Sequence, residues 1–323
     1  MPKKLELVAP AGTPAALEAA LRAGADAIYA GFRDETNARN FPGLNFSLGE
    51  MAEGTRLAHR HGAKLYVAIN TYPSPGETRK WHRAIAAAED AGADAVILAD
   101  IGLCEHAARR HPSLRRHLSV QASAATPEAI SFYRNEFGIS RVVLPRVLSI
   151  KDIAALIAET GIETEVFAFG GLCTMAEGRC ALSGQACGIS PNRAGVCSPA
   201  SAAHFTEDAG ETTFHLGPFA LNRFTQGENP GYPTVCKGRY LVDGKSVYAF
   251  EEPRSLDIMP FLGELAKAGV TALKIEGRQR GRAYVEKVAK AFRKAIDGQG
   301  TTDLSGISEG EKTTSGAYLA GWQ

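Results

Sequence analysis

The sequence predicts an α/β protein whose main body is a (β/α)8 barrel of the TIM type, with a cysteine-rich insertion between the seventh strand and the seventh helix. Short apolar runs alternate with helical patterns eight times, as expected for parallel strands that are buried on both faces. The phrase AGADAIYAG at Ala23 returns as AGADAVILAD at Ala91, and each marks a helix end followed by a strand. Apart from one insertion, nothing interrupts the eight alternations. We therefore expect a closed barrel rather than an open doubly wound sheet.

The expected strands are short, and several end at a polar residue or a turn. They are residues 5–9, 27–30, 64–69, 95–99, 117–120, 141–144, 165–169 and 272–275. The expected helices begin with capping residues or with proline at the first helical position. They cover residues 13–22, 47–61, 77–91, 149–160, 255–268 and 282–296, with further helices around Cys104 and after Thr126.

The chain is expected to divide into three parts. Residues 1–170 and 254–297 form the barrel, residues 171–253 the insertion, and residues 298–323 a tail packed on the barrel. The insertion is rich in Gly, Pro, Ser and Asn, and a hairpin is expected with Asp243-Gly244 as its turn. It leaves from the carboxyl end of a strand, which is the face where barrel enzymes place their chemistry.

Composition and charge limit the partners that we expect. A content of 45% hydrophobic and 22% charged residues is typical of a globular enzyme, and a net charge of +1 favours neither nucleic acid nor an anionic membrane surface. No apolar stretch approaches the length of a membrane span, and the N-terminus has no secretory pattern. We therefore expect a cytoplasmic protein without a nucleic-acid partner. In that compartment clustered thiols more often bind metal or do redox chemistry than form disulfides.

Five of the six cysteines lie between Cys173 and Cys236. None of them forms a CxxC pair, so zinc-ribbon and ferredoxin templates do not apply, and spacing alone leaves a metal or cluster site and free thiols equally open. Four thiolates can hold either zinc or an iron–sulfur cluster. Cys104 is expected to pack within a helix. Cys187 is either a plain loop cysteine or a fifth thiol near the cluster.

Polar residues at the carboxyl ends of the strands are the second candidate site. Converging arginines favour an anionic substrate, because a guanidinium matches a carboxylate in two-point geometry. The chain has no GxSxG, HExxH, GK[ST] or GxGxxG pattern, so a hydrolase with a recognisable nucleophile is not expected. The candidates are Asn37, Arg39, Asn45, Asn70, Asp100, Gln121, Arg146, Glu276 and Arg278, and those expected to act in catalysis are Arg39, Asn70, Gln121, Arg146, Glu276 and Arg278.

The segment EVFAFGGLCTMAEGRCALS resembles the signature of the collagenase-like peptidase family (U-thirty-two). The motifs DETNARNFPGLNF, HLSVQASA, RVVLPRVLS, GYPTVCKGRYLVDG, EEPRSL and KIEGRQR, with GAY before Trp322-Gln323, resemble its UbiU-type members over nearly the whole chain. The resemblance implies one 4Fe-4S cluster and no working peptidase. The implied ligands are Cys173 in GGLC, Cys180 in GRC, Cys197 in GVCSPA and Cys236 in TVCKGRY.

The resemblance also implies a function, namely oxygen-independent hydroxylation of the aromatic ring of ubiquinone precursors. The chain would be the iron–sulfur subunit of a heterodimer with a UbiV-like protein, a UbiT-like lipid carrier would present the precursor, and prephenate would donate the oxygen. Arg39, Arg146 or Arg278 would hold this dicarboxylate, with Asn70 and Gln121 orienting it.

Two alternatives remain, an RNA base hydroxylase of the same family and a peptidase-like scaffold in which four cysteines hold zinc without redox chemistry. The chain departs from the family pattern at Cys187 and in residues 201–219, where contacts with a partner could differ.

Overall fold

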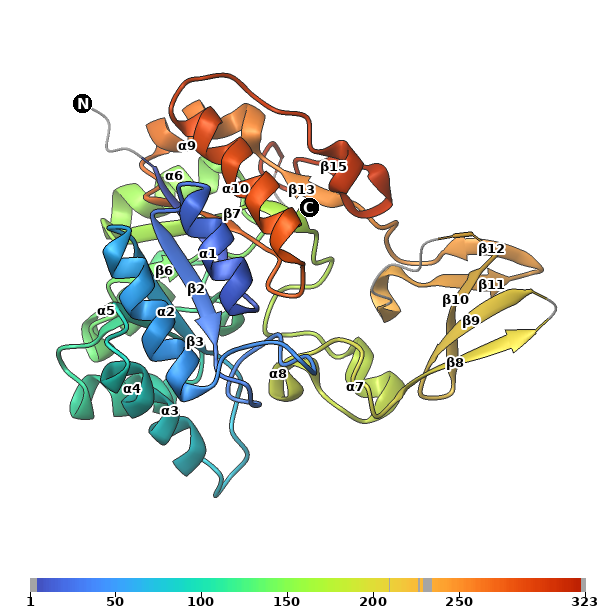
Figure 1. The fold of residues 1–323 in the computed structure, drawn as a ribbon, viewed down its shortest axis with the longest axis horizontal. Coiled ribbons are helices and arrows are strands. Elements are labelled where there is room, and N and C mark those ends of the chain that lie inside the picture. Colours follow the sequence, from blue (N-terminus) through green and yellow to red (C-terminus); the bar gives the residue numbers. More distant parts are fainter. Residues whose placement is uncertain (1–4, 209, 226, 229–233, 321–323) are drawn as a thin grey trace.

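The computed structural model describes residues 5–208, 210–225, 227–228 and 234–320. Its parallel strands close into a barrel because β14 (Ala272–Ile275) pairs with both β1 (Glu6–Pro10) and β7 (Glu163–Gly171). The predicted eight-stranded barrel is confirmed (Figure 1). The strands between β1 and β7 are β2 (Ala27–Gly31), β3 (Lys64–Ile69), β4 (Ala95–Leu98), β5 (Arg115–Leu118) and β6 (Arg141–Val143).

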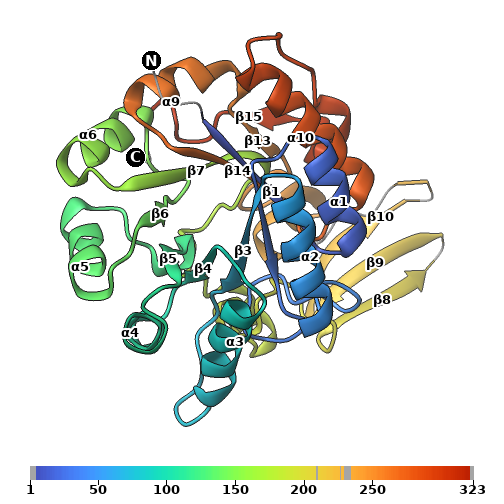
Figure 2. The same cartoon turned by 60° about the vertical axis from the view of Figure 1, so that its left-hand side comes forward.

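Helices form a ring outside these strands, and Figure 2 shows them around the barrel. The capping box of Ser47 and Glu50 is present, and Pro14 and Pro127 open their helices as predicted. Each helix buries an apolar stripe against the strands. The ring comprises α1 (Pro14–Arg22), α2 (Leu48–Arg60), α3 (Arg79–Asp90), α4 (Ile101–Arg110), α5 (Pro127–Phe137), α6 (Ile150–Thr160), α9 (Leu262–Ala268) and α10 (Arg282–Ile296). None of the described helices has the length and apolarity needed to cross a membrane.

Two predicted elements differ from the structure. The helix expected over residues 255–268 is wrong at its start: β13 (Ser255–Asp257) pairs antiparallel with β7, the turn η3 (Met259–Phe261) follows, and only then does α9 begin. The fifth strand, expected over residues 117–120, is wrong at its end, because β5 stops at Leu118. The Ser119 side chain accepts a hydrogen bond from the backbone N–H of Gln121, which turns the chain into η1 (Val120–Ala122).

The segment between β7 and α9 forms small elements that project beside the barrel (Figure 1). Phe214, Leu216 and Leu221 are buried in a small core of its own. The hairpin turn predicted at Asp243-Gly244 is confirmed, since both residues have positive φ, 51° and 75°. In chain order the elements are α7 (Leu182–Cys187), α8 (Pro191–Ala194), β8 (Ala203–Asp208), β9 (Glu211–Leu216), β10 (Phe219–Phe224), η2 (Val235–Lys237), β11 (Arg239–Val242) and β12 (Lys245–Tyr248).

The C-terminal tail crosses the barrel surface through η4 (Ser305–Ile307), η5 (Glu309–Glu311) and β15 (Thr313–Thr314), which pairs with β13. The Tyr318 hydroxyl donates to the carbonyl of Phe167 at 2.8 Å, which ties the tail to β7. Trp322 and Gln323 lie outside the described residues.

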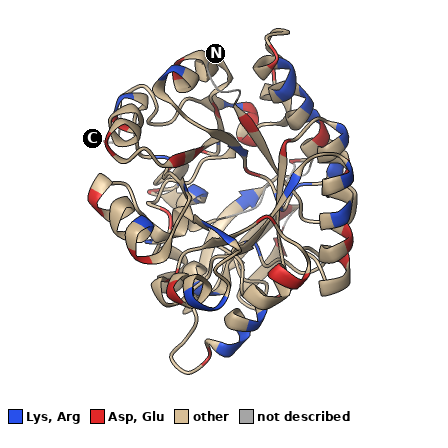
Figure 3. Cartoon of the chain, turned by 90° about the vertical axis from the view of Figure 1, so that its left-hand side faces the viewer, with Lys and Arg blue, Asp and Glu red and all other residues tan. Residues whose placement is uncertain are grey.

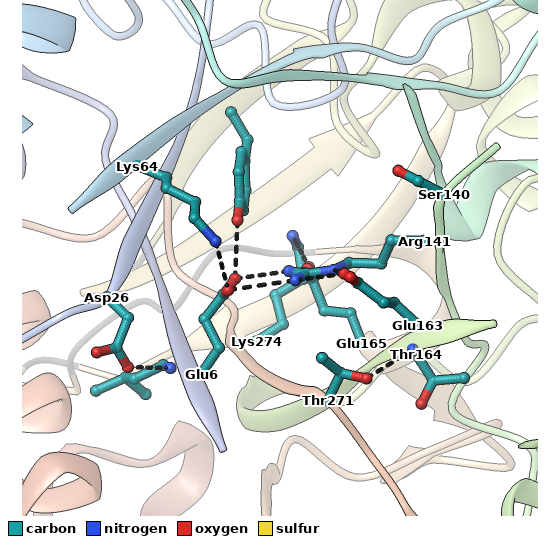
Figure 4. Close-up of polar contacts among 12 residues, drawn as sticks. Glu6, Asp26, Lys64, Ser140, Arg141, Glu163, Thr164, Glu165, Thr271 and Lys274 are labelled. Atoms are coloured by element: carbon teal, nitrogen blue, oxygen red, sulfur yellow. Dashed lines mark hydrogen bonds and ion pairs between the residues drawn. The ribbon is translucent and has the colours of Figure 1, made fainter. Parts of the chain in front are cut away.

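Charged side chains fill the amino-terminal end of the barrel. Figure 3 shows acidic and basic positions on the inner strands as well as on the outer helices. Arg141 is 2% exposed in its side chain and bonds to Glu6 at 2.6 Å, Glu163 at 3.0 Å and Glu165 at 3.3 Å (Figure 4). Lys274 pairs with Glu165 at 2.5 Å. A charge network therefore closes this end of the barrel, and the opposite end is left for a ligand.

Candidate functional site

A cavity of about 130 Å³ lies at the carboxyl ends of the strands. All six residues expected to act in catalysis line it, although the sequence places them far apart. Cys173, Cys180 and Cys197 line the same cavity. The structure therefore brings the two predicted sites together in one place: the polar residues at the carboxyl ends of the strands, which we call the rim, and the cysteines. The six rim residues are Arg39, Asn70, Gln121, Arg146, Glu276 and Arg278.

Arg39 comes from the long loop after β2 and reaches the end of β14. Its Nε lies 3.2 Å from Oε1 of Glu276. Its backbone N–H donates to the carbonyl of Gly195 at 2.7 Å, so this loop is tied to the segment that carries Cys197. Burial alone would raise the pKa of Glu276, but the guanidinium groups of Arg39 and Arg146 outweigh burial and lower it. Glu276 is therefore a buried carboxylate held in its charged form.

Arg146 follows β6 and is 6% exposed. It forms an ion pair with Glu177, and its guanidinium lies 3.5 Å from the centroid of the Phe167 ring. Within the described part of the chain, Nε of Arg146 and Oε2 of Glu177 have no hydrogen-bond partner. A buried pair with unsatisfied polar atoms can accept a polar ligand.

Arg278 is 3% exposed and holds the long loop after β2 in place. Its Nη1 donates to Oδ1 of Asn37 at 2.9 Å, and its Nη2 donates to the carbonyl of Ala38. Burial lowers the pKa of Arg278 to about 10. Its Nε has no partner among the described residues. Arg278 therefore both supports the loop and keeps one donor for a ligand.

The two amide side chains have different surroundings. Asn70 is engaged at both ends: its Oδ1 accepts from the N–H of Ala38 at 2.9 Å and its Nδ2 donates to Oγ of Ser119 at 3.0 Å. Oε1 of Gln121 is buried and has no partner in the described residues. Asn70 thus fixes the loop after β2, whereas Gln121 keeps an acceptor that a substrate could use.

Three of the nine polar candidates do not line the cavity: Asn37, which accepts from Arg278, and Asp100 and Asn45. The Asp100 side chain accepts from the N–H of Leu103 at 3.0 Å and caps α4. Asn45 has a positive φ of 72°, and its amide donates to the carbonyl of Arg39 at 2.9 Å. Both positions support the loops and do not line the cavity.

Several residues of the cavity wall were not predicted from the sequence, namely Tyr29, Ser119, Phe167, Glu177 and Lys274. Lys274 lies 3.7 Å from the centroid of the Tyr29 ring. The sequence contained a signal, because Lys274 in β14 and Glu276 directly after this strand are two positions apart, and both line the cavity. A lysine at a buried strand position next to a rim glutamate would have identified the floor of the site.

The four cysteines that the resemblance selects lie near one another. Burial raises the pKa of Cys197 to about 12, and the thiols of Cys173, Cys236 and Cys180 add to the rise. The pKa of Cys173 is also raised, first by burial of its thiol, although solvent reaches part of this residue. Cys236 is not among the residues that line the cavity; its Sγ lies 3.3 Å from Oγ1 of Thr234.

The other two cysteines have different surroundings. The Sγ of Cys187 donates to the carbonyl of Ser183 at 3.0 Å within its own helix, and Cys104 is buried in α4.

The spacing of the thiols bears on what they could hold. Among the residues that the structure describes, no group of three or more His, Cys, Asp or Glu side chains is placed to ligate a single metal ion.

Glycines shape the loops between the cysteines. Gly178 has a φ of +80°, and a Cβ there would overlap the carbonyl oxygen of Gln121. Only glycine fits where the GRC loop rests on η1, the turn that follows β5. This close approach places Cys180 over the barrel.

Comparison with known proteins identifies the family of this chain. The model of Peptidase family U32 matches residues 12–314. The chain is 31% identical to "tRNA hydroxylation protein P" of Escherichia coli, covering 91% of this chain and 68% of that protein. It is 31% identical to "tRNA hydroxylation protein P1" of Bacillus subtilis, covering 91% of this chain and 64% of that protein. It is also 31% identical to the "23S rRNA 5-hydroxycytidine C2501 synthase" of E. coli, covering 91% of this chain but 39% of that enzyme. The chain belongs to peptidase family U32.

Proposed function

We propose that this chain is an iron–sulfur-dependent hydroxylase, or the cluster-bearing subunit of one, that acts on an aromatic ring. One observation carries the proposal: three arginines and three cysteines, drawn from separate segments, line a single cavity at the carboxyl end of the barrel. The relatives described above are named for hydroxylation and not for peptide cleavage. No peptidase activity is proposed.

Cys173, Cys180, Cys197 and Cys236 would hold a 4Fe-4S cluster, which would supply redox chemistry at the cavity. The chain's own residues would enclose the site, since Phe167 and Val143 exclude water from one side of it.

The arginines would bind the oxygen donor. Arg146 and Arg278 each have a buried Nε without a partner in the described part of the chain, and Gln121 offers a free acceptor. These groups suit a dicarboxylate that also carries a hydroxyl group, which is the chemistry of prephenate. Arg39 and Glu276 would set the charge of the opposite wall.

The comparisons favour an RNA base as the aromatic substrate. Three relatives at 31% identity are named for tRNA or rRNA hydroxylation. Their names argue against the expectation that this chain has no nucleic-acid partner. The chain spans about two thirds of the length of these two tRNA relatives.

The ring of a ubiquinone precursor is the second candidate. The motif resemblance to UbiU-type proteins favours it, as does the net charge of +1, which provides little general attraction for RNA. In this case a UbiV-like protein would complete a heterodimer and a UbiT-like carrier would present the lipid. The two candidates share the cavity and differ in what is brought to it.

Mass spectrometry of a deletion strain grown without oxygen tests the proposal. We expect the strain to lose either a hydroxylated nucleoside of tRNA or rRNA, or ubiquinone with accumulation of an under-hydroxylated precursor. Wild-type protein should restore the product, and Arg278→Ala should not. Cys187→Ala is the matched control and should restore it. Unchanged nucleosides and quinones in the deletion strain would refute the proposal.

A further inference from the structure

A second and larger hollow lies beside the cysteine cavity. It has a volume of about 800 Å³ and runs between the start of α3 and the segment around α8. We call it the α3–α8 groove, and its lining includes Tyr72, Arg79, Arg83 and Arg193. None of the catalytic candidates lines it.

The groove is cationic. Arg79, Lys80, Arg83 and Arg193 face two carboxylates, those of Glu35 and Glu77, and Glu35 is already paired with Lys80. Arg79, Arg83 and Arg193 are exposed, and over residues 5–208, 210–225, 227–228 and 234–320 no ion pair or hydrogen bond engages their guanidinium groups. Three free guanidinium groups on one hollow attract an anion with several charges.

The short helix α8 forms part of the wall between this groove and the cavity. Pro191 and Asn192 of α8 line the cavity, whereas Arg193 lines the groove. Tyr72 connects the two sites from the other side: it lines the groove, and its hydroxyl donates to the carbonyl of Gln121 at 2.6 Å. A long ligand could therefore lie in the groove while one of its rings enters the cavity.

We propose that the α3–α8 groove binds the phosphodiester backbone of an RNA strand whose base enters the cavity. This inference rests on the proposed function with RNA as substrate. Phosphate contacts position a nucleic acid without reading its sequence, and arginine binds phosphate with two parallel donors. A quinone precursor carries no chain of negative charges that would use these arginines.

Binding of unfractionated tRNA to the full-length, anaerobically purified protein tests the groove. The groove variant combines R79Q, R83Q and R193Q. The control variant combines R22Q, R109Q and R110Q, which removes the same charge from exposed arginines on α1 and α4. We expect the groove variant to bind tRNA about tenfold more weakly or worse. The slope of log K for tRNA binding against log[salt] should be smaller in magnitude by about 2 to 3. The control should keep the affinity and slope of the wild type.

Two results would contradict binding of the RNA backbone in the groove. One is an equal loss of tRNA affinity in both variants, which would indicate general electrostatic attraction; the other is wild-type affinity in the groove variant. Nucleoside analysis of the complemented deletion strain separates this failure from failure of the proposed function. If the wild type and the groove variant both restore a hydroxylated nucleoside, the proposed function would be supported and RNA binding in the groove would be rejected. If instead tRNA binding by the purified protein depends on the groove but the nucleosides of the deletion strain are unchanged, the groove would stand and the proposed function would fail.

Discussion

Replacing Arg141 by methionine tests whether the charge network at the amino-terminal end holds the barrel together. The change keeps a long side chain but removes the cation that bonds to Glu6, Glu163 and Glu165. Glu165 is fully buried, and among the described residues its remaining ion-pair partner would be Lys274. Removing one member of a buried ion pair leaves an uncompensated charge and typically costs about 3–5 kcal/mol.

The pKa of Glu6 reflects the same charge network. Burial would raise this pKa, but the hydrogen bond and charge of Arg141, together with Lys64 and Tyr66, lower it from 4.5 to about 2. A depression of that size corresponds to about 3 kcal/mol of stability at neutral pH. Because the folded-state pKa is depressed, this contribution is present above pH 4.5 and is lost as the pH falls toward 2.

Thermal unfolding at pH 7 measures the effect. With an unfolding entropy of about 2.1 cal/mol/K per residue, a loss of 3–5 kcal/mol in a chain of this length lowers Tm by about 4–7 °C. Arg115→Met is the matched control, because Arg115 bonds to the same Glu163 but its side chain is 37% exposed. It should cost less than about 1 kcal/mol. Equal losses in the two variants, or a difference that does not shrink below pH 4.5, would refute the reasoning.

Three further changes address the site. Cys197→Ala should abolish iron binding measured after anaerobic purification, whereas Cys187→Ala should retain it; iron loss in both would contradict the assignment. Gly178→Ala should also lose iron, with a Tm within a few degrees of the wild type, because its Cβ would displace the loop from the carbonyl of Gln121. Arg146→Lys should lower the hydroxylation rate at least about tenfold, because lysine cannot offer two parallel donors; an unchanged rate would remove Arg146 from substrate binding.

The barrel could be predicted from the sequence because its strands alternate with capped helices and because most strands are apolar. The fifth strand was misplaced because Arg115 and Arg116 open β5, and Arg115 joins the charge network with Glu163. Charged residues inside a barrel defeat a search for apolar runs. The extra strand β13 was missed because pairing with Gly170 and Gly171 is a tertiary contact, which local pattern cannot show.

The site could be predicted in part for a similar reason. Topology brings the carboxyl ends of parallel strands together, so polar residues such as Gln121 and Arg146 could be found from their positions in the sequence. The role of Asp100 as a helix cap depends on its orientation, which position alone does not give. The α3–α8 groove was missed because its two walls lie more than a hundred residues apart.

Iron and sulfide content of the air-free protein tests whether the four cysteines hold a 4Fe-4S cluster. We predict coloured protein with about four irons and four sulfides per chain, and loss of both in the Ala variants of Cys173, Cys180, Cys197 and Cys236. Colourless, iron-poor protein from a strictly anaerobic preparation would contradict it, as would zinc in place of iron.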